Sequence, residues 1–119
     1  MQPNVVRLDD AQTLVHLVNL PAAGFTHAVL ARRMLQWKRM GFDLAALEPA
    51  LVLHDIAESH AIYEGVESDI IQAIDGIRLM ESNRDKLSAT EREMFNYRMM
   101  SLSNVSGTAH ELEALLSAR

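Results

Sequence analysis

Apolar residues recur at every third or fourth position along almost the whole chain, and this spacing constrains the fold more than any other feature. A clear example is the stripe formed by Val66, Ile70, Ile74, Ile77 and Met80. Since a helix turns once every 3.6 residues, residues at this spacing lie on one helical face. Nowhere do β-branched residues alternate with polar ones over the length of a strand. The pattern therefore predicts an all-α protein.

Residues that start and stop helices divide the pattern into a compact bundle of about five helices. The expected helices run from Asp9 or Asp10 to Pro21, from Thr26 to Gly41, from Pro49 to Tyr63 or Glu64 with Gly65 as the stop, from Val66 to Met80, and from Thr90 to the C-terminus. Thr90 and Glu93 have the spacing of a capping box, which predicts the start of the last helix.

The last helix is expected to be long, because its apolar stripe continues to the C-terminus. The segment 103–108 has low helix propensity and leaves an alternative open, in which two collinear helices are separated by a break there. A break in this segment is slightly favoured. Long helices with an unbroken stripe often pair with a second copy, so a homodimer is one expected assembly.

Composition limits the classes of function. A chain of 119 residues fits one domain, spanning residues 1–119. It contains no cysteine, which excludes disulfides, thiolate metal sites and a cysteine nucleophile. Its net charge of −5 disfavours nucleic acid as a partner. Because it has neither a signal-peptide pattern nor an apolar run long enough for a membrane span, we expect a cytoplasmic protein that does not bind membranes.

The most informative residues for chemistry are His27 and, 27 positions later, the adjacent pair His54 and Asp55. The pair follows the apolar run 50–53 and is expected to lie on a helix, where Glu58 would share the face of His54 one turn later. Imidazole nitrogens and a carboxylate suit a divalent first-row metal ion that activates a bound water. Over residues 24–60 this arrangement resembles the HD-domain metal phosphohydrolases.

The resemblance implies that His27, His54 and Asp55 bind a divalent metal such as Mn, Fe, Co or Ni. It implies that Glu58 acts as the catalytic acid or base. The chain departs from the family pattern because no aspartate follows Asp85, where the family supplies its fourth ligand. Two further interpretations stay open: an HD-like fold that binds no metal, and ordinary solvated side chains with no cofactor.

A second cluster of interest gathers basic residues around the only tryptophan. It consists of Arg32, Arg33, Trp37, Lys38 and Arg39. Arginine and tryptophan are common at the centres of protein interfaces, so the cluster is a candidate partner-binding surface. A solvated helix face is the alternative.

Two functions remain open from the sequence. The first is a small non-enzymatic regulatory or adaptor protein that presents a helix face to a partner protein, such as a transcription regulator or another effector. The second is an HD-type metal-dependent phosphohydrolase, or a degenerate relative, that acts on a nucleotide or another phosphate ester. The absence of a complete catalytic set favours the non-enzymatic function.

Overall fold

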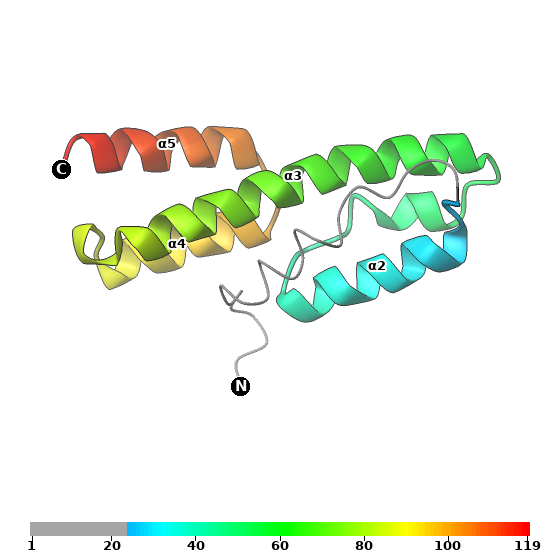
Figure 1. The fold of residues 1–119 in the computed structure, drawn as a ribbon, viewed down its shortest axis with the longest axis horizontal. Coiled ribbons are helices and arrows are strands. Elements are labelled where there is room, and N and C mark those ends of the chain that lie inside the picture. The colour runs from blue at the N-terminus through cyan, green and yellow to red at the C-terminus, as the bar shows by residue number, and fades with distance from the viewer. Residues whose placement is uncertain (1–23) are drawn as a thin grey trace. The chain divides into compact units, whose positions relative to one another are not determined.

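The structure is a computed structural model that describes residues 24–119, and all of the regular secondary structure in this range is helical (Figure 1). It contains the helices α2 (His27–Met40), α3 (Ile56–Ser82), α4 (Ala89–Met100) and α5 (Val105–Ser117), and the short 3-10 turns η1 (Glu48–Leu51) and η2 (Arg84–Lys86). The all-α prediction is confirmed for this range. The helix predicted between Asp9 and Pro21 lies outside it.

The described residues form two compact units with their boundary between Ser68 and Asp69. The first unit holds α2, η1 and the first half of α3, and the second holds the rest of α3 with α4 and α5. No helix within residues 24–119 has both the length and the apolar composition that crossing a membrane requires.

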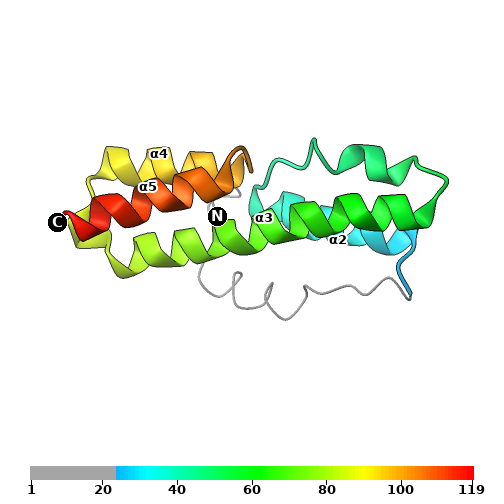
Figure 2. The same ribbon diagram turned by 90° about the horizontal axis from the view of Figure 1, so that it is seen from above.

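The predicted limits of α2 are confirmed. The Thr26 side chain accepts a hydrogen bond from the N–H of Val29 at 3.1 Å, which caps the start of the helix. Gly41 ends it with a φ of 103°, a left-handed conformation that residues with a side chain rarely adopt. The buried residues of α2 face the first half of α3, beside which the helix lies (Figures 1 and 2).

The prediction of two separate helices around Gly65 is wrong, because α3 is one helix of 27 residues that passes through this glycine. Its buried stripe continues without interruption from Tyr63 to Val66 and Ile70. A glycine inside a helix costs only about 1 kcal/mol relative to alanine, and burial of a continuous apolar face outweighs that cost. Pro49 lies in the short 3-10 turn η1, which ends at Leu51, rather than in the first turn of the predicted long helix.

The C-terminal region consists of two helices, so the predicted single long helix is not confirmed. α4 begins at a capping box formed by Ser88 and Glu91, not by the predicted pair Thr90 and Glu93. The chain leaves the helix at residues 101–104, and Leu102 and Asn104 both have a φ of 55°. α5 then runs back beside α4 rather than continuing in line with it (Figures 1 and 2). Arg98 on α4 and Glu111 on α5 form an ion pair across the two helices.

Each unit has its own set of fully buried side chains. In the first unit these include Leu30, Trp37, Leu47, Ala50 and Tyr63. In the second they include Ile70, Ala73, Ile74, Met99 and Leu112. Gly76 lies against Met99, since a Cβ atom added to the glycine would come within 2.5 Å of the Met99 methyl carbon. The absence of a side chain at Gly76 is what lets Met99 pack so close to α3.

Candidate functional site

The predicted metal ligands lie at the start of α2 and just before α3. His27 is the first residue of α2 and is half-buried. His54 and Asp55 are exposed and precede α3, so the prediction that this pair lies on a helix is wrong. The expected spacing of one helical turn between His54 and Glu58 therefore does not apply. Glu58 lies in the first turn of α3 and is exposed.

Asp55 has a local structural role. One of its carboxylate oxygens accepts a hydrogen bond from the N–H of Ala57 at 2.9 Å, and its carbonyl oxygen accepts one from the N–H of Ser59. The first N–H groups of a helix have no partner within the helix, and aspartate is among the residues that satisfy them best. Asp55 thus caps α3 from the position directly before its first residue, Ile56.

Ser59 is a residue of this region that sequence reasoning missed. It is fully buried, and its hydroxyl donates a hydrogen bond to the carbonyl oxygen of Ala50 at 2.7 Å. The hydroxyl oxygen of Ser59 also lies 3.4 Å from Nε2 of His27. With its proton donated to Ala50, the hydroxyl accepts from His27, which favours the tautomer that carries hydrogen on Nε2. A serine inside an amphipathic segment gives no signal of such a role in the sequence.

The structure thus brings His27 to the first turn of α3, through Ser59. Among residues 24–119 no group of three or more histidine, aspartate or glutamate side chains is close enough together to hold one metal ion. Within the described part of the chain, neither His54 nor Asp55 forms a hydrogen bond or an ion pair with His27.

The five predicted partner-binding residues divide between the two sides of α2. Trp37 is fully buried and Arg33 is 9% exposed, so these two face the interior of the first unit. Arg32, Lys38 and Arg39 are exposed. The Trp37 ring stacks on Tyr63 of α3, with ring centroids 5.5 Å apart and planes 9° from parallel. Trp37 therefore fixes α2 against α3 and does not present its ring to a partner.

A buried polar pair on α3 lies next to this stack and was also missed. The Tyr63 hydroxyl donates a hydrogen bond to a Glu67 carboxylate oxygen at 2.5 Å. Burial raises the pKa of Tyr63 above its ordinary value, and the hydrogen bond to Glu67 and its negative charge raise it further, while the charge of Arg33 acts in the opposite direction. Tyr63 consequently remains neutral and keeps donating to Glu67 at physiological pH.

The outer side of α2 forms a surface that we call the cationic α2 face, consisting of Arg32, Leu35, Lys38 and Arg39. Leu35 is 50% exposed. Arg32 comes three residues before it and Arg39 four residues after it, which places all three on one side of the helix. α2 contains no acidic residue. None of the three basic side chains makes an ion pair or hydrogen bond with another described residue. The face therefore has one half-exposed apolar residue at its centre, surrounded by basic side chains that have no ion-pair partner among the described residues.

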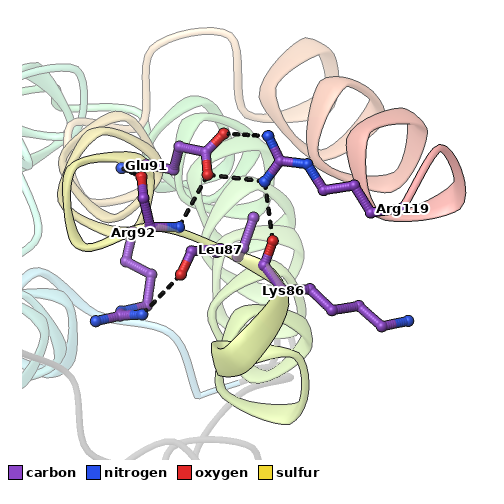
Figure 3. A network of polar contacts seen from close by, with 6 residues as sticks. Lys86, Leu87, Glu91, Arg92 and Arg119 are labelled. Atoms are coloured by element: carbon purple, nitrogen blue, oxygen red, sulfur yellow. Dashed lines mark hydrogen bonds and ion pairs between the residues drawn. The ribbon is translucent and has the colours of Figure 1, made fainter.

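In the second unit, a polar network joins Arg119 to the start of α4 (Figure 3). The two terminal nitrogens of Arg119 each donate to a different carboxylate oxygen of Glu91 at 2.8 Å, and one also donates to the carbonyl oxygen of Lys86. Arg92 donates to the carbonyl oxygen of Leu87. The bidentate pairing of Arg119 with Glu91 is a strong form of ion pair. The network ties the end of α5 to the capping box of α4.

The titration of Glu91 provides a test of this network. The hydrogen bonds from Arg119, with a further contribution from the Ser88 backbone, lower the pKa of Glu91 to about 2. A depressed pKa stabilises the fold above the ordinary pKa of about 4.5, and this contribution is lost as pH falls toward 2. We expect NMR titration of Glu91 to give a midpoint near 2. Arg119→Ala should raise it, and Arg98→Ala, which removes a cation paired elsewhere, should not. A wild-type midpoint at the ordinary value would contradict the bidentate pairing.

Comparisons of the chain with protein-family models, with curated proteins and with solved structures find no match.

Proposed function

We propose that this protein is a small non-enzymatic regulatory or adaptor protein that binds a partner protein through the cationic α2 face. The observation that carries the proposal is the set of three exposed basic side chains, with no ion-pair partner among residues 24–119, around the half-exposed Leu35 on a helix without acidic residues. Exposed apolar surface surrounded by arginine is typical of helix-mediated protein recognition.

The helix that bears this face is held in place by its opposite side. Trp37 and Leu30 are fully buried, and both ends of α2 are capped, by Thr26 and Gly41. A helix fixed in this way loses little conformational entropy when a partner binds, which favours affinity. The matching partner surface is an acidic helical surface with an apolar centre, since opposite charge accelerates and orients association.

The test compares two variants that remove the same charge from different places. Arg32→Ala/Arg39→Ala alters the cationic α2 face, and Arg84→Ala/Lys86→Ala removes two exposed basic side chains of η2. Proteins captured from a lysate of the source cells are quantified by mass spectrometry for wild type and both variants, after circular dichroism has shown equal helicity. We expect the first variant to lose a specific partner roughly tenfold or more, and the second to retain it. Equal capture by all three proteins would overturn the proposal.

The phosphohydrolase alternative has one supporting observation, which is that His27 contacts Ser59 in the first turn of the helix that Asp55 caps. If the alternative holds, manganese should raise the thermal melting point of wild type, because a ligand that binds only the folded state stabilises it. The variant for comparison is Asp55→Asn, since asparagine caps helices about as well as aspartate but is a weaker metal ligand. A melting point that manganese leaves unchanged in wild type would exclude this function.

A further inference from the structure

The second unit contains a groove between α3 and α5 that has no role in the proposed function. Its volume is about 320 Å³, and its lining includes Asp75, Gly76 and Leu79 of α3, and Ala109, Leu112 and Glu113 of α5. Ser106 of α5 donates a hydrogen bond to Gln72 of α3 at 2.7 Å. These two residues are the first lining residues of their helices, so the bond joins the helices at one end of the groove. A second hollow shares Leu79 and Glu113 and continues toward Leu116.

The two hollows together follow α3 from Gln72 to its end at Ser82 and reach Asn83, which corresponds to about 15 Å of helix at about 1.5 Å per residue. This length accommodates about three turns of a docked helix. Leu79 and Leu116 are half-buried, so the groove offers apolar surface that a partner helix can cover.

The charge of the groove is acidic. Asp75 on α3 and Glu113 on α5 are exposed and place a carboxylate on each of the two lining helices. Neither forms an ion pair with another described residue. The lining contains no lysine or arginine, and α5 contains none along its whole length. The groove therefore suits a helix with an apolar side chain flanked by basic ones.

We propose that this occupant is the cationic α2 face of a second copy of the chain. Leu35 would cover the apolar groove, while Arg32 and Arg39, about 10 Å apart along α2, would pair with Asp75 and Glu113. This inference rests on the proposed function, because it identifies a partner for the same face. The two complementary surfaces differ, so the contact is head-to-tail and extends beyond a dimer as concentration rises. Self-assembly then competes with any other partner for α2.

The test uses light scattering to measure molar mass over a range of protein concentrations. Wild type is expected to grow in mass with concentration and to dissociate at high salt, since exposed charge pairs are screened. Arg32→Glu/Arg39→Glu and Asp75→Lys/Glu113→Lys should each associate at least about tenfold more weakly when alone. Asp85→Lys/Glu93→Lys changes charge by the same amount on exposed residues outside the groove, and should assemble like wild type.

The decisive experiment mixes the α2-face variant Arg32→Glu/Arg39→Glu with the groove variant Asp75→Lys/Glu113→Lys. One retains a wild-type groove and the other a wild-type α2 face, and the reversed α2 face and the reversed groove are again opposite in charge, so the mixture should recover association with the two variants in equal proportion. This recovery would also show that both variants are folded. A mixture that stays monomeric, or a wild type that stays monomeric at every concentration, would overturn the inference. Either result leaves the lysate capture comparison as an independent test of the proposed function.

Discussion

Trp37→Ala is expected to lower the free energy of unfolding by about 3–5 kcal/mol, the largest effect of any single substitution in the first unit. Trp37 is fully buried and stacks on Tyr63, so truncation removes a large apolar contact and leaves a cavity between α2 and α3. Urea denaturation followed by far-ultraviolet circular dichroism measures the change. Fluorescence is unsuitable, because Trp37 is the only tryptophan.

The matched control is Leu35→Ala on the same helix. Leu35 is 50% exposed, and its truncation should change stability by no more than about 0.5–1 kcal/mol. This pair of variants separates the two sides of α2, since one side supports the fold and the other is proposed to bind a partner. Similar losses for both variants would show that the structure assigns the wrong side of α2 to the interior.

Met99→Ala is expected to lower the free energy of unfolding by about 2–5 kcal/mol. Met99 is fully buried in the second unit, where its methyl carbon occupies the space that a side chain at position 76 would fill. Because Gly76 has no side chain to move into the vacated volume, the cavity should close poorly. Urea denaturation of the variant and wild type gives the comparison.

Met94→Ala provides a control with the same change of residue on the same helix. Met94 is 44% exposed, so its loss should cost less than about 1 kcal/mol. If Met94→Ala destabilised the protein as much as Met99→Ala, the orientation of α4 in the structure would be refuted.

Local sequence signals predicted the ends of a helix correctly where only one nearby residue was suited to cap each end. Thr26 and Gly41 define both ends of α2 because a hydroxyl cap and a left-handed glycine flank one uninterrupted apolar pattern. At the start of α4 the sequence offers two Ser/Thr-x-x-Glu pairs two residues apart, and the pair that forms is Ser88 with Glu91. Spacing by itself does not distinguish two such neighbouring caps.

The candidate site was predicted less well, because its geometry depends on contacts distant in sequence. His54 and Asp55 follow an apolar run that resembles a helix, yet Asp55 caps α3 and the pair precedes it. The contact between His27 and Ser59 joins residues 32 positions apart, and nothing local to either residue indicates it.

The sequence by itself determined the helical class of residues 24–119, the buried stripe from Val66 to Met80 and the limits of α2, since these depend on spacing and caps within a few residues. Tertiary structure decided that α3 continues through Gly65, where burial of one long apolar face outweighs a weak helix breaker. It also decided which side of α2 turns inward. Trp37 and Arg33 lie in the same basic cluster as Arg32 and Arg39, and only the packing of Trp37 on Tyr63 separates them.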